Sequence, residues 1–215
     1  MVEIKILYKT EQLIVCEKPA GIMSEEGGLP NRLREQLGGE IYCVHRLDKP
    51  VGGLMVYARS AAAAAAMSGL ITAGELTKEY LAIVPDKLEA ADGTFTDLLY
   101  HDKAKNHSYI VKRARHGVRE AQLRYEKLAS QNGNALVRIR LLTGRSHQIR
   151  CQFAARAMPL VGDTKYGSRI RKHDLALYSH HLRFIDPFTG DLVDIISYPV
   201  GEFWDELLPD VTDRS

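Results

Sequence analysis

The chain reads, from residue 45 to residue 54, His45-Arg46-Leu47-Asp48-Lys49-Pro50-Val51-Gly52-Gly53-Leu54. Apolar, strand-like residues stand on both sides, at Ile41–Val44 and Leu54–Ala58, so the stretch predicts a loop between two strands. A proline and a pair of glycines shape such a loop tightly and allow it to present a carboxylate to a cleft. Asp48 is therefore either a catalytic carboxylate or, as is very common, a turn aspartate that hydrogen-bonds its own backbone.

Short strands also dominate the region before and after this loop. Ile4–Tyr8 and Leu13–Glu17 predict a hairpin, which a polar loop and a short helix through Leu37 follow. After the second strand of the loop, Ser60 is a good N-cap for the helix that the alanine run favours, and Gly74 is expected to end it.

The rest of the chain continues the same pattern. Strands are expected at Leu76–Val84, Thr94–His101, Ser108–Val111, Ala121–Leu128 and Ala135–Leu142, then a helix at His147–Ala157, a hairpin of Leu175–Ile185 with Leu192–Tyr198, and a short helix around Phe203–Leu208. This order predicts an α+β fold, a mostly antiparallel mixed sheet with flanking helices. Residues 1–215 are expected to form a single domain, which is also compatible with two lobes around a central cleft.

Composition excludes several classes of protein. The longest unbroken apolar stretch, Ala61–Met67, is far too short to cross a bilayer, and charges near the N-terminus oppose a signal peptide. The three cysteines are widely spaced and form no C-x-x-C pair, as expected of reduced thiols. Adjacent His180 and His181 point to opposite faces of a strand, so no metal site is expected. We therefore expect a cytoplasmic protein without a membrane partner, and a monomer because no exposed apolar stripe is evident.

Charge is unevenly distributed although the formal net charge is only +2. A basic segment carries Lys103, Lys105, Lys112, Arg113, Arg115, Arg119 and Arg124, whereas the C-terminal tail carries Glu202, Asp205, Glu206, Asp210 and Asp213. Such a segment either holds phosphates or forms an ordinary solvated face, and charge alone does not decide between these interpretations.

Two further segments place polar residues where a packed fold would not need them. Lys78-Glu79-Tyr80 lies in an apolar strand, where alternation puts Lys78 and Tyr80 on one face. Tyr80 either stacks on a base beside a cleft or simply packs across strands. Gly144-Arg145-Ser146-His147-Gln148-Ile149-Arg150 joins a strand to a helix start. Arg145 there either orients a carboxylate, contacts a phosphate or has a purely structural role.

The combination of these segments resembles one family, the RNA pseudouridine synthases of the RluA type. The segment at 45–48 is similar to the catalytic-loop motif of that family, the segment at 78–80 to its tyrosine motif, and the segment at 144–150 to its arginine motif. Pro159–Gly167 also matches in order and spacing, and Lys18-Pro19-Ala20-Gly21 resembles the entry loop. The likeness covers about Leu13 to Leu182.

The resemblance implies the reaction and the residues that perform it. Uracil is detached from C1′ of a uridine, rotated, and reattached through C5, so that no redox cofactor, metal or energy source is required. Asp48, Tyr80 and Arg145 are expected to be catalytic, with Asp48 acting as a nucleophile or as a base. The residues expected to bind RNA are Arg46, His45, Lys78, Lys112, Arg113, Arg115, His147 and Arg150. The expected partner is a stem-loop of ribosomal or transfer RNA, whose target base must leave its stack.

Two departures from the family pattern leave alternatives open. Val51-Gly52 stands where the family usually has Thr-Ser, which removes two hydroxyls. The chain also begins almost at the catalytic domain, so target selection is expected to come from that domain. The main alternative is an inactive RNA-binding protein that keeps the fold. A glycosidic-bond hydrolase is the second alternative, but such enzymes normally use two carboxylates and only Asp48 is well placed.

Overall fold

The computed structural model describes residues 3–170 and 174–208, which fall into two compact units. Unit 1 joins Met1–Glu79 to Tyr178–Pro199, and unit 2 contains Tyr80–Leu177 and the segment from Val200 onward. Two residues of the acidic tail, Asp210 and Asp213, lie outside the described residues. Within the described part of the chain, no helix combines the length and the apolar character that a membrane span needs.

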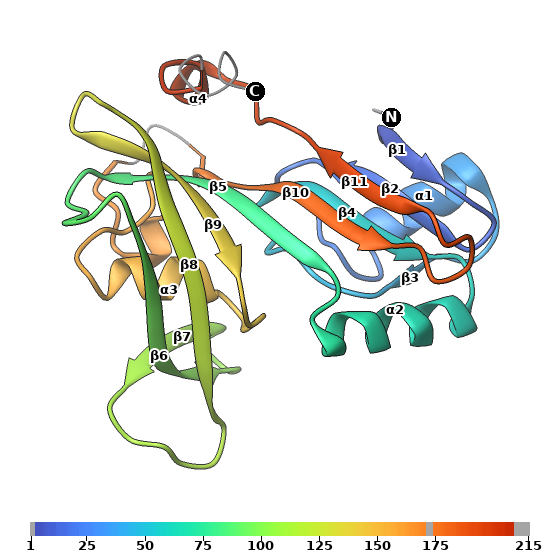
Figure 1. Ribbon diagram of the computed structural model, residues 1–215, viewed down its shortest axis with the longest axis horizontal. Coiled ribbons are helices and arrows are strands. Elements are labelled where there is room, and N and C mark those ends of the chain that lie inside the picture. Colours follow the sequence, from blue (N-terminus) through green and yellow to red (C-terminus); the bar gives the residue numbers. More distant parts are fainter. Residues whose placement is uncertain (1–2, 171–173, 209–215) are drawn as a thin grey trace. The chain divides into compact units, whose positions relative to one another are not determined.

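Unit 1 is a mixed sheet with two helices (Figure 1). Its elements are β1 (Ile6–Lys9), β2 (Leu13–Lys18), α1 (Leu29–Leu37), β3 (Tyr42–Cys43), β4 (Gly52–Ala58), α2 (Ala61–Ala73), β10 (Leu177–Ile185) and β11 (Leu192–Ile196). The pairs β1–β2, β2–β4, β3–β4 and β10–β11 are antiparallel, whereas β4–β10 is parallel. The predicted hairpins at both ends of this unit are confirmed.

Helix α2 covers the sheet of unit 1 with its few large side chains. Met67 and Leu70 pack in one buried cluster with Leu54 and Val56 of β4. The Ser60 hydroxyl accepts a hydrogen bond from the Ala63 N–H, and the residue after the helix, Gly74, has left-handed backbone angles. The N-cap, the alanine run and the C-cap glycine therefore act as the sequence predicts.

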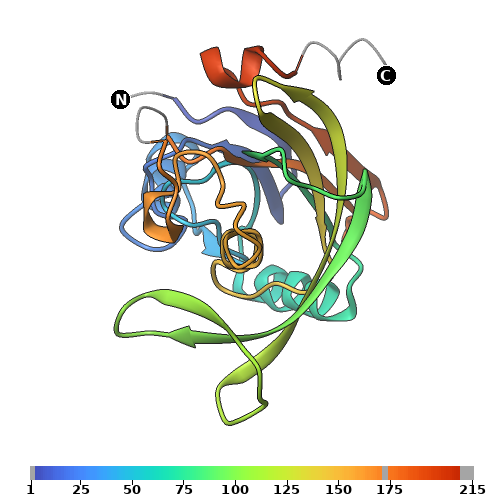
Figure 2. The same ribbon diagram turned by 90° about the vertical axis from the view of Figure 1, so that its left-hand side faces the viewer.

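Unit 2 is built on long antiparallel strands (Figure 2). Its elements are β5 (Thr77–Pro85), which crosses into this unit at Tyr80, β6 (Asp92–Asp102), β7 (His107–Val111), β8 (Val118–Gln131), β9 (Asn134–Leu141), α3 (Gln148–Ala154), the 3-10 turn η1 (Thr164–Tyr166) and α4 (Glu202–Asp205). The strand order is β5-β9-β8-β6-β7. The two units together confirm the predicted α+β class.

Both predicted helices of unit 2 are shorter than expected. His147 has a left-handed backbone, with φ of 52°, so α3 begins only at Gln148. At the other end Ala157 also has a positive φ, 57°, and Pro159 disfavours helical angles at the residue before it. The C-terminal helix spans Glu202–Asp205 instead of continuing to Leu208.

One glycine fixes how β4 starts. Gly53 has φ of +112°, a left-handed conformation that favours glycine. A Cβ added there would lie 2.6 Å from the Ser179 backbone nitrogen and would overlap the Ser179 carbonyl. Ser179 is the partner of Gly53 in the parallel β4–β10 pair. Only glycine therefore allows the two backbones to approach so closely directly after the Asp48 loop.

Candidate active site

The loop that carries Asp48 connects β3 to β4 in unit 1. The Val51 N–H donates to the Asp48 carbonyl at 2.9 Å, which closes a turn over Lys49 and Pro50. Asp48 itself is half-buried. The Asp48 backbone carbonyl is therefore the acceptor that forms this turn.

The backbone on both sides of Asp48 is held by residues 18–24. The Ser24 hydroxyl, which is buried, accepts from the Leu47 N–H at 3.0 Å and donates to the Leu47 carbonyl at 2.7 Å. The Lys49 carbonyl accepts from the Gly21 N–H at 2.8 Å. Since the residues before and after Asp48 are both bound, the position of its Cα is fixed within unit 1.

Lys18 adds a buried positive charge to this arrangement. Its side chain is 1% exposed, and its ammonium donates to the carbonyls of Pro19, Ile22 and Lys49 at 3.1, 2.7 and 3.3 Å. Burial lowers the pKa of Lys18 to about 8, although the negative charge of Asp48 acts in the opposite direction. At neutral pH Lys18 therefore places a cation in the electrostatic environment of the Asp48 carboxylate.

His45 is an acceptor for the protein backbone. Its Nε2 accepts from the Val56 N–H at 3.1 Å, which requires that nitrogen to be unprotonated. Burial, together with the positive charge of Lys78, holds the pKa of His45 well below its usual value. Burial also lowers the pKa of Lys78. The structure thus brings His45 and Lys78 together in unit 1, while their contact with RNA stays a prediction.

Arg46 differs from its neighbours because it is exposed. Its guanidinium forms an ion pair with Glu25 at 2.9 Å, and both side chains are 59% exposed. A pair this exposed contributes little to stability, so Glu25 releases the arginine at small cost. The structure therefore places Arg46 on the surface, and its contact with RNA stays a prediction.

Tyr80 and Arg145, the other two predicted catalytic residues, belong to unit 2. Tyr80 lies on β5 and is 5% exposed. Arg145 is exposed, and its Nε donates to the Glu120 carbonyl at 2.8 Å. The Arg145 N–H donates to Gln148 Oε1 at 3.0 Å, and the same oxygen accepts from the Thr143 hydroxyl. One glutamine side chain therefore holds the loop of residues 143–148, which we call the arginine loop.

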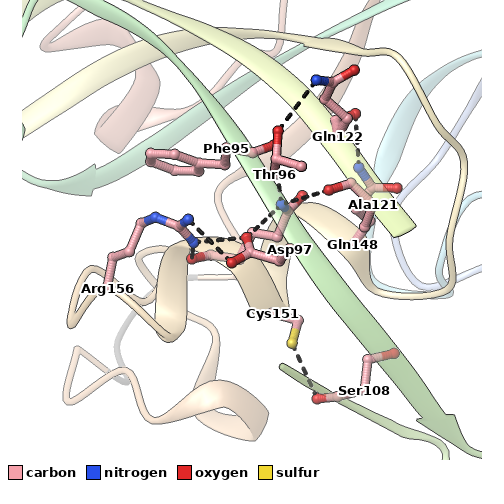
Figure 3. A network of polar contacts seen from close by, with 10 residues as sticks. Phe95, Thr96, Asp97, Ser108, Ala121, Gln122, Gln148, Cys151 and Arg156 are labelled. Carbon is pink, nitrogen blue, oxygen red and sulfur yellow. Dashed lines mark hydrogen bonds and ion pairs between the residues drawn. The ribbon is translucent and has the colours of Figure 1, made fainter. Parts of the chain in front are cut away.

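A polar network fixes the helix that follows the arginine loop (Figure 3). Arg156 forms two bonds with the Asp97 carboxylate, at 2.9 and 3.2 Å, while its guanidinium lies 3.9 Å from the centre of the Phe95 ring. The Gln152 amide donates to Asp97 at 2.7 Å and to the carbonyl of Ala121. Helix α3 is thereby bound to β6 and β8, the strands beneath it.

Two residues predicted to bind RNA are buried within unit 2. His147 is 9% exposed, and its Nδ1 lies 2.9 Å from the Tyr166 hydroxyl. Arg150 is 5% exposed and makes two bonds of 2.8 Å with the Asp163 carboxylate. These contacts give both residues a structural function in unit 2, and their contact with RNA stays a prediction.

Three other predicted RNA-binding residues stand on the surface of unit 2. Lys112, Arg113 and Arg115 are exposed in the loop between β7 and β8, residues 112–117, which we call the basic loop. The basic loop turns at the end of the long strand β8 (Figure 2). Arg115 lies over the Tyr100 ring at 5.1 Å, which shapes the loop without neutralising its charge.

Sequence reasoning missed the residues that support these loops. Lys18 and Ser24 hold the Asp48 loop from 20 or more positions away. A lysine at the end of an otherwise buried strand was the available signal for Lys18. In the described part of the chain, no three His, Cys, Asp or Glu side chains gather as a metal site would need.

Comparisons with known proteins agree with this architecture. Residues 12–155 match the family model described as RNA pseudouridylate synthase. The chain is 31% identical over 218 residues to tRNA pseudouridine synthase C of Haemophilus ducreyi, covering 90% of each protein. It is 27% identical over 227 residues to ribosomal large subunit pseudouridine synthase D of Xanthomonas campestris, covering 94% of this chain and 67% of that protein.

A solved structure shares the fold. The human protein titled RNA pseudouridylate synthase domain containing 4 superposes with a TM-score of 0.77 at 22% identity, covering 97% of this chain and 93% of that one. The fold is thus the pseudouridine synthase fold. The chain belongs to the RNA pseudouridylate synthase family. It is an RNA pseudouridine synthase, an isomerase that converts uridine in RNA into pseudouridine.

Proposed function

We propose that Asp48 is the carboxylate that performs the isomerisation. The observation that carries this proposal is the double attachment of its neighbours: Ser24 binds Leu47 and Gly21 binds Lys49, so this one residue of the loop is held on both sides. A turn aspartate without a catalytic function would not need its Cα fixed from a distant segment. Lys18, which donates to the Lys49 carbonyl one residue further on, adds a positive charge to the electrostatic environment of Asp48.

The reaction exchanges one bond of the uridine for another. The C1′–N1 bond breaks, the uracil rotates, the C1′–C5 bond forms, and the proton lost from C5 is balanced by one gained at N1. Asp48 acts as a nucleophile or as the base that removes a ribose proton. Following the resemblance, Tyr80 stacks on the uracil and handles the C5 proton, and Arg145 supplies positive charge for the reacting carboxylate. Arg46 fills the space that the flipped base leaves.

We further propose that the substrate is transfer RNA. The relatives named tRNA pseudouridine synthase C match this chain over 90–94% of their own length, whereas the ribosomal enzyme matches over 67% of its length. The exposed basic loop supplies the charge for a folded RNA. We expect a monomer that works in the cytoplasm, and light scattering after size exclusion measures the oligomeric state.

Tritium release from RNA labelled at C5 of uridine tests these assignments. Wild type is expected to release tritium from transfer RNA, and Asp48→Asn is expected to release none while binding the same RNA with similar affinity. Activity of Asp48→Asn near the wild-type level would overturn Asp48 as the catalyst. Release from ribosomal RNA alone would overturn the substrate, and binding without release from any RNA would indicate an inactive protein with this fold.

A further inference from the structure

Ser108 of β7 directs all of its polar groups toward the arginine loop and α3. It is 1% exposed and pairs with His101 of β6 in the antiparallel ladder. Its hydroxyl donates to the Ser146 carbonyl at 2.6 Å, and its N–H donates to the Tyr166 hydroxyl oxygen at 2.8 Å. Its carbonyl accepts from Cys151 Sγ at 3.2 Å, the contact drawn in Figure 3. The backbone of β7 is therefore bound to η1 and α3 at this residue, and the Ser108 side chain is bound to the arginine loop.

The hydrogen bonds around Ser108 have a defined direction. A backbone N–H only donates, so the Tyr166 hydroxyl oxygen is the acceptor and its own hydrogen is available for Nδ1 of His147, at 2.9 Å. The Ser108 hydroxyl has one hydrogen, which goes to Ser146, so His101 Nδ1 at 3.0 Å is its donor. Ser108 thus holds Ser146 directly and His147 through Tyr166. These are the two residues that follow Arg145.

Tyr166 is itself fixed by a buried ion pair. The Asp163 carboxylate accepts from the Tyr166 N–H at 3.3 Å and forms the bidentate pair with Arg150. The Arg150 guanidinium lies 5.0 Å from the centre of the Tyr166 ring. The phenol ring consequently has little freedom, and its hydroxyl stands at a constant position between Ser108 and His147.

Ser108 is also close in sequence to the basic loop. Strand β7 ends at Val111, and Lys112 and Arg113 follow at once, fully on the surface. Ser108 and the basic loop are therefore joined by a short stretch of paired strand, residues 108–111. The strand is held to β6 over its whole length, from His107 to Val111, so it moves as one piece.

We propose that Ser108 and Tyr166 are positioning residues that set the arginine loop in its active arrangement and couple it to RNA bound at the basic loop. This inference rests on the function proposed above for Arg145 and for the basic loop. It assigns Ser108 and Tyr166 no contact with the substrate: they act through the backbone of Ser146 and the ring of His147. The coupling makes the reaction step sensitive to contacts made by the flanking RNA.

The first experiment compares Tyr166→Phe with Tyr125→Phe in single-turnover tritium release at saturating RNA. Tyr125 is a buried tyrosine of the same unit that packs on Phe95, 4.8 Å between ring centroids, so its variant controls for loss of a hydroxyl in general. We expect the rate of Tyr166→Phe to fall about tenfold with the RNA Kd within about twofold of wild type, and Tyr125→Phe to keep the wild-type rate. Ser108→Ala is expected to lower the rate similarly.

Two outcomes of this comparison would contradict the positioning function. A lower melting temperature of Tyr166→Phe with an unchanged rate of the folded protein would overturn the positioning function. A loss of RNA affinity without a loss of rate would do the same, because the proposal concerns the step after binding. Arg145→Ala, measured in parallel, distinguishes failure of the positioning proposal from failure of the function proposed for Arg145. If Arg145→Ala keeps the wild-type rate, the proposed function of Arg145 is wrong, whatever the result for Tyr166→Phe.

The second experiment tests the coupling with Arg113→Ala in wild type and in the double variant Ser108→Ala/Tyr166→Phe. At saturating RNA, Arg113→Ala is expected to slow the single-turnover rate about threefold in wild type and to have no further effect in the double variant. The double variant lacks both links to the arginine loop, the Ser108 hydroxyl bond to Ser146 and the Tyr166 hydroxyl bond to His147. Equal effects of Arg113→Ala in the two backgrounds would show independent sites and overturn the coupling.

Discussion

The Asp48 loop of unit 1 and the arginine loop of unit 2 are held in place by different means. The Asp48 loop receives its hydrogen bonds from Ser24, Gly21 and Lys18, at least 23 positions away, and nearly all of them end on backbone atoms. The arginine loop combines a local contact, from Gln148 three residues after Arg145, with distant contacts from Glu120, Ser108 and Tyr166. The Asp48 loop therefore depends on one preceding segment, residues 18–24, whereas the arginine loop depends on several elements of unit 2.

Each unit also buries a cation, and the partners of the two cations differ. Lys18 is surrounded by neutral carbonyls, so part of the cost of burying its charge remains, as its lowered pKa records. Arg150 faces the carboxylate of Asp163, and the two side chains are only 6% and 1% exposed. The stability that Lys18 contributes therefore depends on pH, whereas the stability of the Arg150–Asp163 pair depends on both side chains being present. The predictions below test this difference, from the largest expected effect to the smallest.

The largest effect is expected from Asp163→Asn. The substitution keeps the shape of the side chain but leaves the buried Arg150 without a counter-charge, which costs about 3 kcal/mol or more of unfolding free energy. Urea denaturation followed by circular dichroism measures the loss. The double variant Arg150→Met/Asp163→Leu, which removes both charges, is expected to recover most of it. A loss below about 1 kcal/mol for Asp163→Asn would show that the pair is not the anchor of η1 and α3.

The next effect concerns Lys18 and pH. Its pKa in the folded protein is about 8, below the ordinary value of 10.5, so between these values the unfolded chain keeps a proton that the native chain has released. Stability contributed by this residue therefore rises with pH across that window. The unfolding free energy of wild type relative to Lys18→Met is expected to increase by roughly 2 kcal/mol between pH 8 and pH 10. A difference that stays flat over this range contradicts the assignment.

A smaller effect on stability, with a larger one on activity, is expected from Ser24→Ala. The variant loses both hydrogen bonds to Leu47, which costs about 1 kcal/mol of unfolding free energy. Because Asp48 follows directly, the single-turnover rate is expected to fall about tenfold while RNA affinity stays constant. Ser68→Ala, which removes an exposed serine on α2 of the same unit, is the matched control. Equal single-turnover rates for Ser24→Ala and Ser68→Ala would show that Ser24 does not position Asp48.

The smallest effect is expected from Gly52→Ser. A Cβ at Gly52 would lie 3.4 Å from the Lys18 carbonyl and 3.5 Å from both Ala20 and Tyr178, which are ordinary contacts, and the backbone φ lies outside the left-handed region. The change is expected to alter the unfolding free energy by less than about 1 kcal/mol and the rate by less than about twofold. Gly53→Ala, one residue further, is the contrasting variant and is expected to destabilise unit 1 severely. Similar stability for the two variants would refute the close approach at Ser179.

Local chemistry explains which parts of the fold were predictable from sequence. The Ser60 N-cap, the alanine run and Gly74 define α2 because each signal acts within a few residues. The strands β1, β2, β8 and β9 follow from apolar patterns in the same way. The ends of α3 did not, because His147 and Ala157 adopt positive φ without being glycine, and tertiary contacts such as the Tyr166 bond to His147 impose that conformation.

In the candidate site, too, local motifs were predictable from the sequence, whereas contacts between distant residues were not. Asp48, Tyr80 and Arg145 were identified through motifs, and the structure adds the environment of each. That environment depends on pairs distant in sequence, such as Ser24 with Leu47 and Ser108 with Ser146. A serine is common in any chain, and nothing in the sequence around Ser24 or Ser108 distinguishes it from the others. Only the fold shows which hydroxyls bind the backbone of these loops.

The contact between Gly53 and Ser179 limits the number of residues that the Asp48 loop can contain. The parallel register of β4 with β10 sets Gly53 opposite Ser179, and the next residue toward the C-terminus is Leu54. A deletion of one residue between Asp48 and Gly53 would draw Leu54 into that place, where its Cβ would overlap a backbone carbonyl. Substitutions within the loop are thus tolerated more readily than deletions. The geometry at Ser179 therefore limits the number of residues between Asp48 and Gly53 more strictly than their identity.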